Sequence, residues 1–165
     1  MKLICYLTIA LIISFFLSCV PTDDNNPSDT VKEIKADFGD CLENQINVID
    51  DTMETIIEYT YQNNVLNIKH LQAGFNCCFD YILVRIEVKD NVIFIKEKDI
   101  NPNCHCLCLR DIYYSIEDIA PGQYQVRVTE PYLPENDAEI IFNVDLKEFT
   151  SGTESFVRTM YPWVL

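Results

Sequence analysis

Hydrophobic and polar residues alternate along most of the chain, and the longer periods typical of helices are scarce. In residues 82–89, Ile or Val occupies every second position from Ile82 onward, which predicts a strand with one buried face. Asp90 and Asn91 then predict a tight turn, and residues 92–98 predict the returning strand. Alternation therefore predicts antiparallel hairpins as the units of the fold.

The same pattern recurs on both sides of this hairpin. Asn63 and Asn64 separate two predicted strands, residues 55–61 and 65–71, because Asn tolerates the positive φ of a tight turn. Residues 41–53 fit a strand or a short helix equally well. Many short strands at hairpin spacing predict an all-β fold, either a single antiparallel β-sandwich or a small barrel. Further strands are predicted at residues 112–116, 124–128, 140–146 and 153–159.

The first 18 residues have the order of charged and apolar residues that is typical of a signal peptide. Lys2 is followed by an apolar run, residues 3–17, and then by Ser18 and Cys19. The run is shorter than the roughly 20 residues that a bilayer-spanning helix needs. We therefore favour a cleaved leader, and a retained membrane anchor is the alternative.

The end of the leader, Phe16-Leu17-Ser18-Cys19, resembles the cleavage box of bacterial lipoproteins. It departs from the family pattern at Phe16, where Leu is usual. The resemblance implies that Cys19 is the first mature residue and carries the lipid, palmitate included. An ordinary secretory cleavage fits less well, because Phe16 is too large for the small-x-small rule.

A polar, acidic segment follows, and it predicts a flexible tether over residues 19–36 ahead of a domain spanning residues 37–165. Within it, Thr22-Asp23-Asp24 resembles the acidic sorting signal of surface-exposed lipoproteins in Bacteroidota-type bacteria. That resemblance implies a place in the outer membrane, exposed at the cell surface. A plain solvated linker is the alternative interpretation.

The net charge of the chain limits the classes of molecule that it can bind. Asp and Glu number 26 against 12 Lys and Arg, a formal net charge of −14, and removing residues 1–18 takes away only Lys2, which gives −15. Such an acidic body repels nucleic acid phosphates and anionic lipid surfaces. We therefore expect no nucleic acid and no nucleotide as partner, and contact with the membrane through the N-terminal lipid.

Two further resemblances concern the domain itself. The segment IEDIAPGQYQV resembles transthyretin-like and carboxypeptidase-regulatory-like sandwiches at Pro121, Gly122, Tyr124 and Val126. The combination of FNCC, CHCLC, PGQY and YPW, within residues 75–163, resembles a family of uncharacterised Cys-rich bacterial lipoproteins. That family implies an extracytoplasmic β fold and no known reaction.

Cysteine is the strongest chemical signal in the domain. Cys5 leaves with the leader and Cys19 is the expected lipidation site, so six cysteines remain. An even number of cysteines in an exported domain favours disulfides. The disulfide candidates are Cys41, Cys77, Cys78, Cys104, Cys106 and Cys108.

The spacing of these cysteines suggests how they pair. In a strand, the three cysteines of CHCLC form a row on one face, and alternation extended back from Ile82 puts Cys78 on the buried face. A bridge between the neighbours Cys77 and Cys78 would be strained. Six cysteines allow fifteen pairings. We expect Cys77 and Cys78 each to pair with the row, which leaves its remaining member for Cys41.

Two other chemistries stay open for the same residues. A thiol-disulfide oxidoreductase would use Cys106 and Cys108, and a thiolate site would bind zinc or copper(I). The sequence lacks the Cys-x-x-Cys spacing typical of both, so we expect no cofactor. The alternative metal ligands are Cys77, Cys78, Cys104, Cys106, Cys108 and His105.

No sequence motif indicates catalysis. His70 and His105 are the two histidines, and neither Gly-x-Ser-x-Gly nor His-Glu-x-x-His occurs. We expect His70 to be a structural or surface residue and the protein to be a non-catalytic binding or structural module. The abundant aromatic residues would suit a glycan or an envelope protein as partner. We favour core packing for them, and predict that Tyr114 and Tyr124 are buried.

Overall fold

The computed structural model describes residues 30–42, 53–133, 135 and 137–159. Within these ranges the chain forms strands and no helix, which confirms the all-β prediction. The strands, in chain order, are β1 (Thr30–Phe38), β2 (Met53–Gln62), β3 (Val65–Asn76), β4 (Tyr81–Lys89), β5 (Val92–Ile100), β6 (Leu107–Ile116), β7 (Gln123–Thr129), β8 (Ile140–Asp145) and β9 (Ser151–Arg158).

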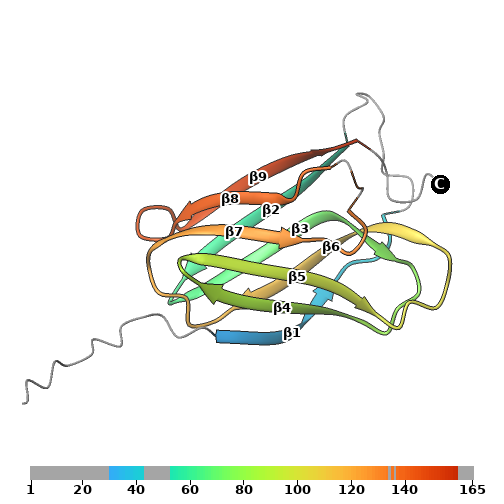
Figure 1. Ribbon diagram of the computed structural model, residues 1–165, viewed down its shortest axis with the longest axis horizontal. Coiled ribbons are helices and arrows are strands. Elements are labelled where there is room, and N and C mark those ends of the chain that lie inside the picture. The colour runs from blue at the N-terminus through green and yellow to red at the C-terminus, as the bar shows by residue number, and fades with distance from the viewer. Residues whose placement is uncertain (1–29, 43–52, 134, 136, 160–165) are drawn as a thin grey trace, which may run out of the picture.

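All nine strands join one sheet in the order β8-β7-β5-β4-β1-β6-β3-β2-β9 (Figure 1). β1 lies in the middle and connects two halves. Residues 30–36 pair with β4, whereas Asp37 and Phe38 pair with β6. The two halves face each other across the core, as in a sandwich, and the sheet curls until its outer strands meet: the rings of Phe142 on β8 and Phe156 on β9 have centroids 6.2 Å apart.

The core between the halves consists mainly of the alternating aliphatic residues that the sequence pattern marks. The buried faces of β4 and β5 carry Ile and Val at every second position, from Ile82 to Ile95. They pack against Ile57, Ile68 and Ile112 of the other half, all fully buried. Burial of this apolar surface is the main force that holds the two halves together.

The predicted hairpin turns are confirmed. Asn63 and Asn64 have φ of 53° and 62°, and Asp90 and Asn91 have φ of 49° and 60°. These are the left-handed values that a two-residue hairpin loop of type I′ requires. One pair of neighbours is not antiparallel: β5 and β7 are parallel, because the chain crosses to the other half to form β6 before it returns.

Two expectations differ from the structure. The expected tether extends to residue 36, but β1 begins at Thr30. Charged residues are as numerous as apolar ones in β1, four of each, so the hydrophobic pattern is weak; β1 is held by its pairing with β4 and by the buried side chain of Ala36. The CHCLC segment was expected to lie in a strand, but β6 begins only at Leu107. Most of the ambiguous segment, residues 43–52, lies outside the described residues.

The two tyrosines that we predict to be buried differ in their exposure. Tyr114 is buried, as predicted, and its ring lies between the halves of the sheet. Tyr124 is only partly buried and packs at the margin of the core, where its hydroxyl donates to the carbonyl of Ala120 at 3.0 Å. The difference arises because Tyr124 lies near the start of β7, next to the turn that precedes this strand.

Candidate functional site

All six cysteines of the domain are joined in three disulfides at one end of the sheet. The bridges are Cys41–Cys108, Cys77–Cys106 and Cys78–Cys104, with Cα–Cα distances of 5.6, 5.3 and 5.7 Å. These distances lie within the range that a disulfide spans without movement of the backbone. The expected pairing is confirmed: Cys77 and Cys78 each bond one member of CHCLC, and Cys41 bonds the third.

The backbone brings these cysteines together. β3 and β6 are antiparallel neighbours, and their pairing ends where Asn76 lies opposite Leu107. Cys77 and Cys78 follow β3 directly, and the loop that carries Cys104 and Cys106 leads into β6. The two segments therefore continue side by side past the ordered strands, so each cysteine of one lies within reach of a cysteine of the other.

Asn76 fixes the loop on which these bridges lie. Its Nδ2 donates to the carbonyl of Cys104 at 2.6 Å, and its Oδ1 accepts from the backbone amide of Cys78 at 2.8 Å. Main-chain bonds add to this: the amide of Cys77 donates to the carbonyl of Cys106 at 2.9 Å, and that of Asn103 to the carbonyl of Cys78 at 2.7 Å. The buried Asn76 side chain thus pairs with the backbone groups of Cys104 and Cys78 that these main-chain bonds leave over.

The orientation expected from a strand does not hold for this loop. Cys78 was expected on the buried face, but it is exposed, as is Cys106. Cys77, Cys104 and Cys108 are partly buried. Strand parity fails because residues 77–80 and 101–106 are irregular, so neighbouring side chains no longer alternate between two faces.

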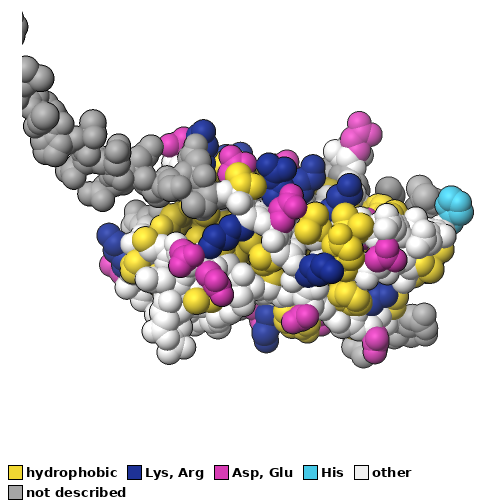
Figure 2. Space-filling model, turned by 90° about the horizontal axis from the view of Figure 1, so that it is seen from below, with side chains coloured by type: hydrophobic (Ala, Val, Ile, Leu, Met, Phe, Trp, Pro, Cys, Tyr) yellow, Lys and Arg dark blue, Asp and Glu magenta, His cyan; other side chains and the backbone are white. Residues whose placement is uncertain are grey.

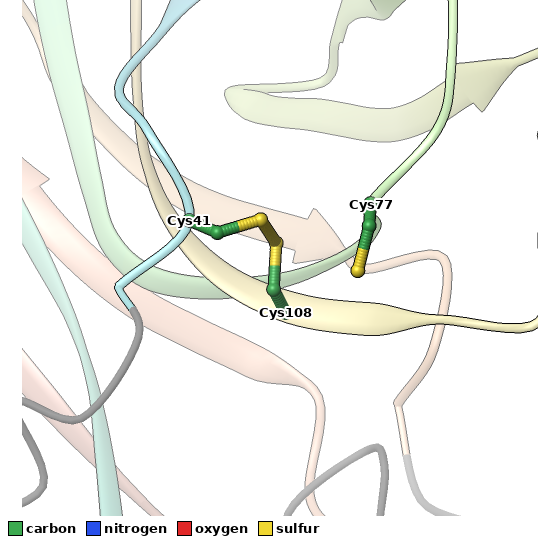
Figure 3. Close-up of side chains that lie close together, drawn as sticks. All are labelled: Cys41, Cys77 and Cys108. Carbon is green, nitrogen blue, oxygen red and sulfur yellow. A yellow bond between two sulfur atoms is a disulfide. The ribbon is translucent and has the colours of Figure 1, made fainter.

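Two of the bridges lie against each other. The sulfur atoms of Cys41, Cys77 and Cys108 are all within 4.8 Å of one another, although Cys77 bonds Cys106 and not the other two. Figure 3 shows Cys77 beside the Cys41–Cys108 bridge. The third bridge, Cys78–Cys104, does not belong to this group of sulfurs.

A buried arginine lies next to this sulfur cluster. Arg110 on β6 donates through Nη2 to Cys41 Sγ at 3.1 Å and through Nη1 to the carbonyl of Gly39 at 2.7 Å. Its guanidinium lies 5.4 Å from the ring centre of Phe38 and 5.1 Å from that of Phe79. The cation is thus placed between two aromatic faces and a sulfur atom.

Arg110 is incompletely satisfied by its partners. Its Nε is a buried nitrogen without a hydrogen-bond partner, the one such side-chain atom in the described ranges. Burial lowers the pKa of Arg110, and the nearby charge of Asp40 opposes that shift. A cation with spare hydrogen-bonding capacity is therefore held at the sulfur of Cys41, where it would stabilise negative charge.

The alternative metal ligands are not brought together as a set. Among the described residues, the sulfur group with metal-ligand spacing is Cys41, Cys77 and Cys108, and Cys41 was not among the expected ligands. His105 is exposed and outside this group. Cys106 and Cys108, the expected redox pair, belong to different bridges.

A second group of polar residues lies inside the sheet. His70 on β3 has no exposed surface, and its Nδ1 lies 3.0 Å from both carboxylate oxygens of Glu97 on β5. Its Nε2 lies 2.7 Å from Thr55 Oγ1 and 3.5 Å from Glu130. The hydroxyl of Tyr114 also donates to Glu97, at 3.1 Å.

The hydrogen bonds indicate that His70 is protonated. The hydroxyl of Thr55 donates to the carbonyl of Leu71 at 3.1 Å, so it must accept from Nε2 of His70. Nδ1 must donate as well, because a carboxylate only accepts. Burial would lower the pKa of His70, but the charge and hydrogen bond of Glu97, with the charge of Glu130, raise it above its ordinary value.

The charges of this network balance. Glu130 forms an ion pair with Arg158 of β9, and His70 pairs with Glu97. Burial raises the pKa of Glu130, and the charges of His70 and Arg158 oppose that shift. None of the four side chains is more than 10% exposed. A closed and balanced network joins β3, β5 and β9 and supports the fold; it offers no surface to a ligand.

The buried Asp99 extends the polar interior toward the disulfides. It accepts from the backbone amide of Asn76 at 3.1 Å and from the hydroxyl of Tyr132 at 2.7 Å. Burial and this bond to Asp99 raise the pKa of Tyr132 to about 12. The burial of these acids could have been predicted from the sequence, because Glu97 and Asp99 continue the alternation of Ile93 and Ile95 on the buried face of β5.

An open hollow of 610 Å³ lies at the other end of the sheet from the disulfides, near the starts of β7 and β9 and the end of β8. Phe149, at its rim, is 59% exposed, and Tyr124 is partly buried beside it. Side-chain amides surround these rings, so the hollow combines aromatic faces with hydrogen-bonding groups. The amides belong to Asn91, Gln123, Gln125 and Asn143.

The surface outside these features carries both signs of charge. Figure 2 shows acidic and basic side chains interspersed with hydrophobic ones on one face of the molecule. The expected lipidation site, Cys19, lies outside the described residues, as do Tyr161 and Trp163. In the part of the chain that is described, no helix is long and apolar enough to cross a membrane. Comparisons with protein families, curated proteins and solved structures found no match.

Proposed function

We propose that the chain is a lipoprotein of the bacterial cell envelope, anchored in the outer membrane through Cys19, whose β domain is a non-catalytic binding module. The observation that carries the proposal is the pairing of all six domain cysteines in three bridges. Stable disulfides belong to exported proteins, because the cytosol keeps thiols reduced. The apolar leader that ends at Ser18 and Cys19 supports the same compartment.

The anchor is tested by changing its cysteine. Cys19→Ala should abolish labelling by radioactive palmitate and move the protein from the detergent phase to the aqueous phase. Cys5→Ala is the matched control, since Cys5 is removed with the leader and its loss should leave labelling unchanged. A Cys19→Ala protein that still takes up palmitate and stays with the membrane would overturn the lipoprotein assignment.

The hollow bounded by Tyr124 and Phe149 supports binding of a glycan. Sugars present apolar ring faces and many hydroxyls, which suit an exposed aromatic ring surrounded by side-chain amides. Phe149 is the most exposed of the aromatic residues at the hollow, and Gln123 is held in place by a 2.7 Å bond to Asp145. An envelope glycan is the class of ligand that this chemistry favours.

Binding is tested on a panel of immobilised bacterial oligosaccharides. Phe149→Ala should lower the affinity for the oligosaccharide about tenfold, because one aromatic contact is lost. Tyr113→Ala removes an aromatic residue that is 37% exposed on β6 and does not line the hollow, and should leave binding unchanged. If no oligosaccharide binds, or if the two variants bind equally, the glycan site is wrong while the lipid anchor stands.

A further inference from the structure

The sulfur cluster brings a covalent bridge, a third sulfur and a buried cation into one place. We propose that the bridges Cys77–Cys106 and Cys41–Cys108 form a thiol–disulfide exchange site that accepts a small external thiol. The proposal goes beyond binding and does not depend on the lipid anchor or the glycan hollow. It rests on the 4.8 Å grouping of Cys41, Cys77 and Cys108 and on the contact of Arg110 with Cys41.

The entry point is Cys106. It is exposed, whereas its partner Cys77 is partly buried, so an incoming thiolate reaches the sulfur of Cys106 first. The thiolate forms a bond to Cys106 Sγ and breaks the Cys77–Cys106 bond. The electron pair of the broken bond stays on Cys77 Sγ as a thiolate.

The second step passes the exchange inward. The thiolate of Cys77 lies within 4.8 Å of Cys108 Sγ, attacks it and forms a Cys77–Cys108 bond. The Cys41–Cys108 bond breaks, and its electron pair leaves on Cys41. Two disulfides and one thiolate enter the sequence, and two disulfides and one thiolate leave it, so no oxidant or reductant is consumed beyond the entering thiol.

Arg110 decides which sulfur leaves. A positive charge beside a thiol stabilises its thiolate, and a stabilised thiolate leaves faster. Arg110 Nη2 already contacts Cys41 Sγ at 3.1 Å, and its Nε has no partner among the described residues. Attack at Cys108, which releases Cys41 next to this cation, is therefore favoured over attack at Cys41.

The new bond needs a shift of Cys77 toward Cys108, because their sulfur atoms lie within 4.8 Å of each other and a disulfide bond is about 2.05 Å long. Cys77 lies just past the last residue of β3, and its amide is tied to the loop by the bond to the carbonyl of Cys106 at 2.9 Å, while Cys108 is fixed in β6 opposite Phe75. The Cys78–Cys104 bridge also has an exposed sulfur, Cys78, but it lies outside the group of three sulfurs, so attack there passes no bond inward. It acts as a structural clamp and takes no part in the exchange.

The experiment uses the protein as it is isolated from cells, purified without reductant and mixed with less than one equivalent of reduced glutathione. Thiols are then alkylated at acidic pH and the peptides are mapped by mass spectrometry. The expected product carries glutathione on Cys106, an alkyl group on Cys41 and a new Cys77–Cys108 bridge. Glutathione on Cys106 with the alkyl group on Cys77, and an intact Cys41–Cys108 bridge, would overturn the proposal.

Two variants separate exchange from simple reduction. Arg110→Met should slow the appearance of the Cys41 thiol about tenfold, whereas Arg110→Lys, which keeps the charge, should slow it less. The double variant Cys78→Ser/Cys104→Ser is the control and should still form the Cys77–Cys108 bridge. Equal rates for Met and Lys at position 110 would show that the cation has no part in the reaction. The peptide map of the unaltered chain decides the proposal even where a variant fails to fold.

Discussion

Replacing Glu97 by Gln tests the buried network with little change of shape. The carboxylate of Glu97 accepts hydrogen bonds from His70 at 3.0 Å and from Tyr114 at 3.1 Å, and it is fully inaccessible. Gln has the same size and keeps one acceptor oxygen, but it removes the negative charge that stabilises protonated His70. The change therefore isolates the electrostatic part of the interaction.

The expected loss follows from these two bonds. A hydrogen bond to a charged group contributes about 1.5–3 kcal/mol and a neutral one about 0.5–1.5 kcal/mol. Each of the two bonds loses the difference between these values when its acceptor becomes neutral, which is about 2–3 kcal/mol for the two together. A buried charge left wholly without a partner costs about 3–5 kcal/mol. That limit is not reached, because Glu130 stays 3.5 Å from His70 and the imidazole can release its proton. We expect Glu97→Gln to lower the free energy of unfolding by about 2–3 kcal/mol at pH 7.

Urea unfolding followed by far-ultraviolet circular dichroism, with the disulfides intact, measures this free energy. Glu33→Gln removes an exposed carboxylate from the middle of β1 and should change it by less than about 0.5 kcal/mol. The loss from Glu97→Gln should also shrink when His70→Gln is already present, since the two residues share one interaction. A loss below about 0.5 kcal/mol, or strict additivity of the two changes, would refute the argument.

Two further outcomes follow from the structure. The raised pKa of His70 means that the folded state keeps a proton that the unfolded state releases above about pH 6.5, so the free energy of unfolding should fall as pH rises from there, by at most about 1.4 kcal/mol per pH unit. Urea unfolding between pH 6 and 8.5 should show this fall in the natural chain and not in His70→Gln. A methyl group added at Gly152 would lie 2.5 Å from the ring of Tyr59, so Gly152→Ala should cost about 1–3 kcal/mol. Gly39→Ala, whose nearest atom would be 3.8 Å away, should cost almost nothing, and equal thermal stability of the two variants would contradict this reasoning.

The elements that the sequence predicted well depend on short-range signals. The turns at Asn63 and Asp90 are encoded by residues that tolerate positive φ, and the strands beside them alternate clearly. The cysteine pairing was predictable for a related reason. Two short segments rich in cysteine can pair in few ways without strain, and Cys41 then has one partner left.

The features that escaped prediction depend on contacts between distant parts of the chain. The place of β1 in the centre of the sheet follows from its pairing with β4 and β6, about 50 and 75 residues later, and nothing in its own composition indicates this. His70 and Glu97 each continue a buried stripe of their own strand, which could have been noticed. Their contact could not, because β3 and β5 are not neighbours in the sheet.

The central place of β1 determines how the domain responds to mechanical force. A pull on the chain ahead of Thr30 acts along β1, so it strains the seven residue pairs with β4 together, in shear, rather than opening them one after another. Just beyond the strand, the covalent bond from Cys41 to Cys108 transfers the remaining load to β6. The segment that can be drawn out from this end is therefore limited to the residues before Cys41. A molecule held by its N-terminal end in flowing liquid would resist the pull first through β1 and then through this bond.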